Sequence, residues 1–248
     1  MPFESWRDVY HHDLQAAYAP LVAPFLFLIW RALKGAPAGG VVPAAARFVD
    51  AYAIFFAVET MLDPIATGPL VRALGLADGW GGTVVLLTFV LLGDFRVFLL
   101  VFAVAALASG QSWHALLGRA AAWTLVVPIA AYAIRGAIGA AVPLPANAIW
   151  LVYELGFFAM ALYLRERWVP GALAEVRVYL RAVTAYVAAY YALWAISDLL
   201  IQVAGVDAGW ALRIIPNQLY YGFWIPFVLL RFFAPRYQST NTSVQASR

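Results

Sequence analysis

Acidic residues lie inside long apolar stretches of this sequence, where a side chain cannot reach water along its own helix: Glu59, Asp63, Asp94, Glu154 and Asp198. On translocon scales a charge at the centre of a membrane helix costs on the order of 3 kcal/mol, so such residues should face a shared interior. At a rise of about 1.5 Å per residue, they fall between mid-membrane and the outer face. A buried carboxyl group of this kind can act as a general acid, bind a ligand or relay a proton.

Spacing adds detail to two pairs of these residues. Glu59 and Asp63 are four apart and share a helix face, and Pro64 frees a backbone carbonyl one turn back. Asp94 and Arg96 are two apart and cannot face each other on one helix. We therefore expect Arg96 to pair with a carboxylate from another span.

Aromatic residues on the same stretches can form a wall beside the acids. A cation beside aromatic faces is stabilised by up to about 2 kcal/mol when it is desolvated. We take Glu59, Glu154 and Asp198 as candidate catalytic acids. The candidate substrate-binding residues are Asp63, Asp94, Arg96, Asn217, Tyr153, Tyr190, Trp194, Tyr220 and Trp224. The structural alternative is that the polar residues tie helices together and that the aromatic residues only pack.

The elements that position these residues must be transmembrane helices. Of the 248 residues, 65% are hydrophobic and 12% charged, whereas an average soluble domain is about half apolar and a quarter charged. Stretches long enough to cross about 30 Å of hydrocarbon lie near 17–34, 46–66, 82–109, 113–142, 146–165, 178–204 and 210–233. They are too long for barrel strands and lack strict alternation. The sequence predicts an all-α, polytopic bundle of about seven spans.

Basic residues set the predicted orientation and the division of the chain. Most Arg and Lys residues flank one side, and the other side holds only Arg7, Arg72, Arg135 and Arg213. This bias places the N-terminus outside and the C-terminus in the cytoplasm, in a multi-pass protein of the plasma (inner) membrane. We expect a polar segment at 1–16 that can lie along the interface, a single transmembrane domain at 17–235 and a disordered tail at 236–248.

Several site types are disfavoured by composition. The chain has no cysteine, which removes disulfides and thiolate metal sites. His11 and His12 lie on the opposite side of the predicted membrane from His114, which argues against a three-histidine zinc site. The only lysine, Lys34, lies at the end of the first stretch, which argues against a retinal Schiff base. We expect no metal, no cofactor and no nucleic-acid partner, and as partners the bilayer and a lipid-soluble small molecule.

Two short motifs resemble a known family. Phe55-Phe56-Ala57-Val58-Glu59 precedes Pro64 near the end of the second stretch, and Asn217 precedes Tyr220, Tyr221 and Trp224 in the last one. In these motifs and in its layout, the chain resembles the small seven-helix membrane-bound terpene cyclases of meroterpenoid and indole-diterpene pathways. That family has an aromatic residue before the Glu and an acid in place of Asn217.

The resemblance implies an enzyme, an isomerase or lyase, that acts on an isoprenoid. Glu59 would protonate an epoxide or alkene, and Glu154 and Asp198 would orient it or take the final proton. A dry site favours the neutral carboxyl that such a step requires.

Two other functions stay open. One is a proton- or cation-coupled transporter or channel in which the acids form a relay, although the sequence shows no internal repeat. The other is a receptor-like seven-helix binder of an apolar ligand.

Overall fold

The structure is a computed structural model that describes residues 4–35, 42–112, 114–141 and 148–234. Throughout these ranges the regular secondary structure is helical and no strand occurs. The predicted all-α class is therefore confirmed. The tail predicted at 236–248 lies outside the described residues.

Among the described residues, five helices are long and apolar enough to cross a membrane, as expected for a multi-pass membrane protein. The first is Pro43–Ala73, which comprises α3 (Pro43–Ile65), the π-helical turn η1 (Ala66–Leu70) and α4 (Val71–Ala73). The others are α5 (Trp80–Ala108), α6 (Leu117–Gly139), α7 (Ala148–Tyr163) with η3 (Leu164–Trp168) and η4 (Val169–Gly171), and α8 (Ala174–Asp198) with η5 (Leu199–Val203).

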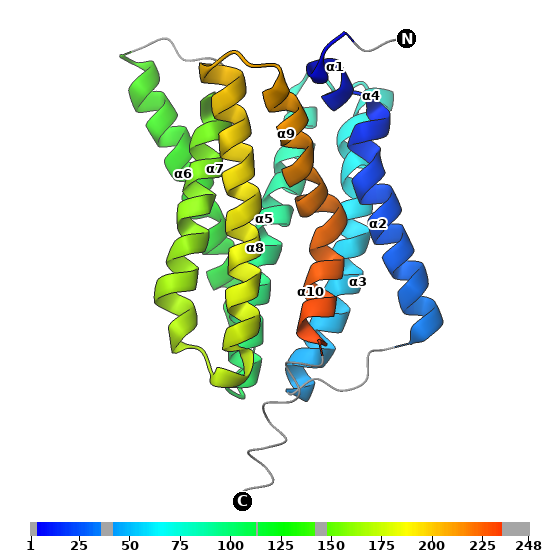
Figure 1. Cartoon of the computed structure of the whole chain (residues 1–248), viewed down its shortest axis with the longest axis vertical. Coiled ribbons are helices and arrows are strands. Elements are labelled where there is room, and N and C mark those ends of the chain that lie inside the picture. Colours follow the sequence, from blue (N-terminus) through cyan, green and yellow to red (C-terminus); the bar gives the residue numbers. More distant parts are fainter. Residues whose placement is uncertain (1–3, 36–41, 113, 142–147, 235–248) are drawn as a thin grey trace, which may run out of the picture.

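Two further helical rods run beside these five. One is α2 (Asp13–Lys34), and the other is formed by α9 (Ala208–Asn217), η6 (Gln218–Phe223) and α10 (Trp224–Phe232). Figure 1 shows them roughly parallel to the other helices, with successive rods running in opposite directions. The short α1 (Trp6–Tyr10) and the α8–α9 connection lie at one end of the bundle, here called the α1 end.

The core is dense in one half of the bundle and sparse in the other. In α5 the buried residues start at Gly93 and run to Ala106, and none lies between Trp80 and Leu92. In α6 burial ends at Ala131, and the last turns of this helix lean away from the bundle in Figure 1. The half with few buried residues is at the α1 end.

Candidate functional site

A cavity of about 290 Å³ lies in the α1 half of the bundle, between α5, α7, α8 and the α9–η6 rod. Aromatic rings supply much of its wall, and two carboxyl groups and one guanidinium line it. The lining residues are Tyr10, Leu86, Val90, Asp94, Trp150, Tyr153, Glu154, Tyr191, Trp194, Arg213, Asn217, Tyr220 and Tyr221.

Asp94 lies deepest in this cavity, near the middle of α5. Its two carboxyl oxygens each accept a hydrogen bond from a tyrosine, Tyr153 of α7 and Tyr191 of α8. The ring of Phe157 stacks on Tyr191 with centroids 5.0 Å apart and so fixes its orientation. No ion pair to Asp94 occurs within the described part of the chain. Helices α5, α7 and α8 thus build one buried acid with two hydroxyl partners.

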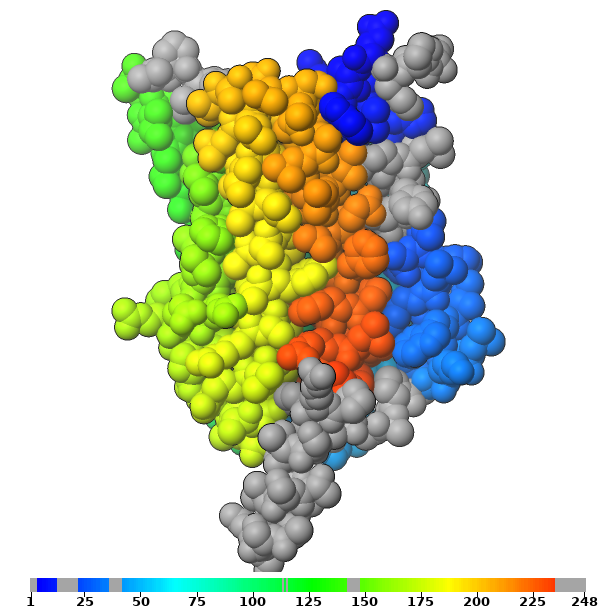
Figure 2. Space-filling model, in the orientation of Figure 1, coloured from blue at the N-terminus to red at the C-terminus, as the bar shows by residue number. Residues whose placement is uncertain are grey.

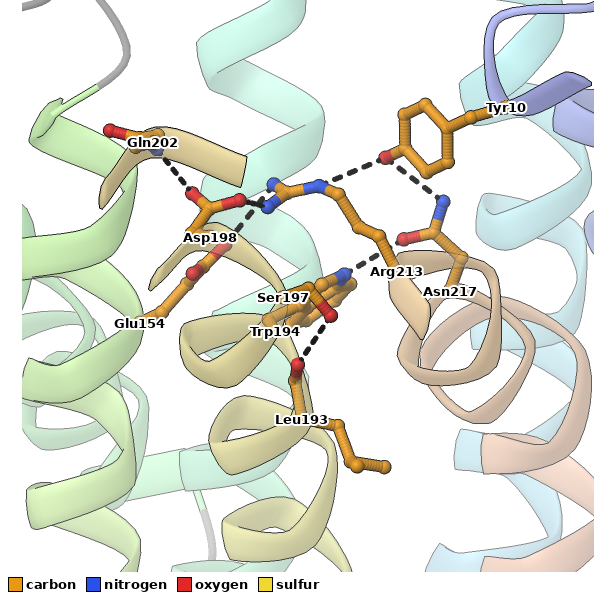
Figure 3. Close-up of polar contacts among 9 residues, drawn as sticks. All are labelled: Tyr10, Glu154, Leu193, Trp194, Ser197, Asp198, Gln202, Arg213 and Asn217. Carbon is orange, nitrogen blue, oxygen red and sulfur yellow. Dashed lines mark hydrogen bonds and ion pairs between the residues drawn. The ribbon is translucent and has the colours of Figure 1, made fainter. Parts of the chain in front are cut away.

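A second polar cluster lies nearer the α1 end and is centred on Arg213 (Figure 3). Its Nη2 lies 3.1 Å from Glu154 Oε1, its Nη1 pairs with Asp198, and its Nε donates to the Tyr10 hydroxyl at 3.2 Å. Gln202 Nε2 donates to Asp198 at 2.9 Å. One guanidinium therefore faces two carboxyl groups, and the cluster has net charge −1 if both are ionised.

The second oxygen of Glu154 has an unusual position. Glu154 is buried, and its Oε2 has no hydrogen-bond partner among the described residues. A buried polar atom without a partner is disfavoured, and Glu154 is one of the residues that line the cavity.

Arg213 is not among the site residues that the sequence predicts. The sequence predicts it as a flanking charge on the outer side, and in the structure it lies in the second turn of α9 with its side chain only 15% exposed. Asn217 lies one turn further on, and its Nδ2 also donates to Tyr10, at 3.2 Å. The four-residue spacing of Arg213 and Asn217 on one face of a helix was the signal that could have identified this residue.

Arg96 forms a third cluster beyond the cavity wall. It is buried, its Nη1 lies 4.0 Å from Glu59 Oε2, and it donates to Thr60 Oγ1 at 3.1 Å. Its Nη2 donates to the backbone carbonyl of Tyr220 at 2.6 Å, and its guanidinium carbon lies 4.2 Å from the Tyr220 ring centroid. The prediction that Arg96 pairs with an acid of another span is confirmed, and Glu59 of α3 is the partner.

The η6 segment is held in place by side chains from other helices. A π-helical turn leaves carbonyls out of the α-helical pattern, and such turns often occur at functional sites. Besides the Arg96 bond, the Tyr186 hydroxyl donates to the Leu219 carbonyl at 2.8 Å. Gly93 allows Tyr220 to approach α5, because a Cβ at this position would collide with the tyrosine hydroxyl. These contacts place the Tyr220 ring in the cavity wall.

The structure separates the sequence-predicted residues into two groups. Those that line the cavity are Asp94, Glu154, Tyr153, Trp194, Asn217 and Tyr220. Glu59, Asp63, Arg96, Asp198, Tyr190 and Trp224 are not among the lining residues. Trp194 and Asn217 contact each other, since the indole Nε1 donates to the amide oxygen at 2.8 Å.

The second group supports the wall from behind. Trp224 Nε1 donates to the Tyr52 hydroxyl at 3.1 Å, and that hydroxyl donates to the Arg96 carbonyl at 3.0 Å. Tyr190 is buried, and its hydroxyl has no hydrogen-bond partner among the described residues. Asp63 is half-buried, and Thr67 Oγ1 donates to its backbone carbonyl at 2.7 Å.

Within the described ranges, no group of three or more His, Cys, Asp or Glu residues is placed to hold a metal ion. Comparison with profiles of known protein families, with curated proteins and with solved structures finds no match to this chain. The function must therefore be inferred from the cavity and the elements that hold it.

Proposed function

We propose that this protein is a membrane enzyme that protonates a lipid-soluble isoprenoid in its cavity, in the manner of a terpene cyclase. The proposed topology has about seven spans, with the N-terminus outside and the C-terminus in the cytoplasm of a plasma (inner) membrane. In this topology the seven spans are the five apolar helices, α2 and the α9–η6–α10 rod. At 1.5 Å per residue these two rods are roughly 33 and 37 Å long, enough to cross the hydrocarbon.

The observation that carries the proposal is the Tyr153–Asp94–Tyr191 unit at the floor of an aromatic cavity. Burying a neutral carboxyl group is far less unfavourable than burying an ionised one that lacks a cation partner. After proton loss, the two tyrosine hydroxyls would stabilise the Asp94 carboxylate by hydrogen bonds to both oxygens. The unit is therefore suited to deliver a proton and to hold the resulting charge.

The proposed reaction is an isomerisation. Before the reaction Asp94 is protonated and donates to one tyrosine hydroxyl, in place of the bond that this hydroxyl gives to the carboxylate. That hydroxyl gives its proton to the epoxide oxygen or alkene carbon of the substrate and takes the carboxyl proton of Asp94. The new cation is attacked by the π-electrons of another double bond, which closes a ring. Loss of a proton from carbon to an acceptor then forms an alkene, so that substrate and product have the same formula.

Glu154 is the proposed acceptor of that last proton. Its Oε1 is held by Arg213, and its Oε2 has no partner among the described residues. The rings of Trp150, Trp194 and Tyr220 line the same cavity and would stabilise the cation while excluding water.

Glu59 has a different position from the one that the resemblance implies. It lies beside Arg96 and is not among the residues that line the cavity. We therefore assign proton donation to the Asp94 unit, and to Glu59 the positioning of Arg96 and, through it, of Tyr220.

The test uses purified protein in bicelles with the terminal epoxides of farnesyl and geranylgeranyl acetate as probes. We expect cyclic isomers of unchanged mass, and a rate lowered about 100-fold or more in Asp94→Asn, as for loss of a general acid. The matched control is Asp78→Asn, since Asp78 is exposed in the turn before α5. Full activity in Asp94→Asn, or no turnover of either probe by the wild-type chain, would overturn the assignment.

One feature favours proton-coupled transport as a second candidate. Acids lie in succession along the bundle, with the Arg213 cluster nearer the α1 end and Asp94 deeper. Buried acids in such an order can relay protons. Proton flux in proteoliposomes that follows a pH gradient and is lost in Asp94→Asn would favour transport. If the wild-type protein shows no such flux, transport is excluded and the enzyme remains the proposed function.

A further inference from the structure

Helix α1 contributes Tyr10 to the cavity wall and is tied to α9 and to the α8–α9 connection. The Asp207 carboxylate accepts hydrogen bonds from the backbone N–H groups of Trp6 at 2.8 Å and Arg7 at 3.3 Å. Tyr10, at the other end of α1, lines the cavity and accepts hydrogen bonds from Arg213 and Asn217. A molecule that entered past α1 would have to break these contacts.

The α8–α9 side of the cavity is joined by a hydrogen bond between the two helices. This side is lined by Tyr191 and Trp194 of α8 and by Asn217 of α9, and the Trp194 indole donates to the Asn217 amide oxygen. In Figure 2 the side chains of α8 and of the α9–α10 rod form a continuous surface on the face turned to the viewer. This face offers no route inward.

The side between α5 and α7 is different. Here the cavity is lined by Leu86 and Val90 of α5 and by Trp150 of α7. Leu86 is also 44% exposed on the outer surface, so this lining residue faces both the cavity and the surroundings. None of the three carries a charge.

Helix α6 packs loosely at the level of the cavity, where Arg135, one turn beyond Ala131 on the same helix face, is half-buried. Its buried residues end at Ala131, Tyr132 is 72% exposed, and the following turns lean away in Figure 1. An apolar groove of about 340 Å³, which includes Ile134 and Val152, lies where α6 and α7 diverge. Leu86 and Val90 lie roughly 9 and 15 Å from the Trp80 end of α5, a helix of roughly 43 Å, which places them within the outer part of the hydrocarbon layer.

From these observations we infer a lateral portal between α5 and α7, formed by Leu86, Val90 and Trp150, through which a lipid-soluble molecule passes from the bilayer into the cavity. The inference rests on the proposed function, since it gives the route of the proposed substrate. The occupant is the apolar body of that molecule. The polar or reactive end of this molecule contacts Asp94 and Glu154, and its apolar part lies along the portal.

The absence of cysteine from the chain permits a direct test. Asn217→Cys places one thiol on the cavity wall opposite the portal. Proteoliposomes are treated either with N-cyclohexylmaleimide, which partitions into the bilayer, or with the membrane-impermeant 2-(trimethylammonium)ethyl methanethiosulfonate. Any loosening of α1 by loss of the Asn217–Tyr10 bond would favour the charged reagent, which works against the proposal.

The portal is then narrowed by Leu86→Trp, and Leu87→Trp is the matched control. Leu87 is the next residue of α5, is also 44% exposed and does not line the cavity. We expect Leu86→Trp to slow N-cyclohexylmaleimide about tenfold, an added barrier of about 1.4 kcal/mol, and Leu87→Trp to leave the rate unchanged. Equal slowing by both variants, or preferential modification by the charged reagent, would overturn the portal. Because labelling needs no turnover, this result is independent of whether the epoxides are cyclised.

Discussion

Replacement of Arg213 by methionine tests whether the cluster at the α1 end is held together by a buried ion pair. The side chains of Arg213, Glu154 and Asp198 are 15%, 4% and 5% exposed. Removing one partner of a buried pair destabilises by about 3–5 kcal/mol, because a charge is left uncompensated. Loss of the Tyr10 hydrogen bond adds about 1 kcal/mol. We therefore expect Arg213→Met to lower the free energy of unfolding by about 4–6 kcal/mol.

The triple variant Arg213→Met, Glu154→Gln, Asp198→Asn separates charge from packing. It contains no buried ionisable group in this cluster, so most of the lost stability should return. The assay is the free energy of unfolding in mixed micelles, followed by tryptophan fluorescence. Arg165→Met is the control, because Arg165 forms an exposed ion pair with Glu166 and should change stability by less than about 1 kcal/mol. A triple variant as unstable as the single one would refute the electrostatic explanation.

The remaining predictions concern the cavity wall and its cover. Gly93→Ala should destabilise by about 1–3 kcal/mol through overpacking against Tyr220, and unfolding in mixed micelles measures it; an unchanged stability would contradict the close approach. Tyr186→Phe should lose about 1 kcal/mol with the hydrogen bond to the Leu219 carbonyl, in the same assay, and a stability equal to wild type would count against that bond. In the Asn217→Cys variant, Tyr10→Phe should speed modification by 2-(trimethylammonium)ethyl methanethiosulfonate several-fold. An unchanged rate would show that α1 does not limit entry from water.

The fold class could be predicted from sequence because the length of an apolar stretch is a local property. Each spanning helix satisfies its own backbone hydrogen bonds, so composition and length nearly determine it. The Arg96–Glu59 pair was also within reach, since the two-residue spacing excluded Asp94 as the partner of Arg96.

The site itself was only partly predictable. Tyr191 hydrogen-bonds to Asp94 because of how α5 and α8 are rotated about their axes, and one sequence does not specify that rotation. Tyr10 and Arg213 meet across about 200 residues of chain, so no local pattern links them. Counting charges at helix ends treats each as solvated, which is why Arg213 was not predicted as a site residue.

The contacts of α1 also have a consequence for biogenesis. Trp6, Arg7 and Tyr10 are made about 200 residues before the partners that hold them, Asp207, Arg213 and Asn217. These contacts of α1 can therefore form only after α9 has been made. Until then, Glu154 and Asp198 also lack the guanidinium of Arg213 as their partner.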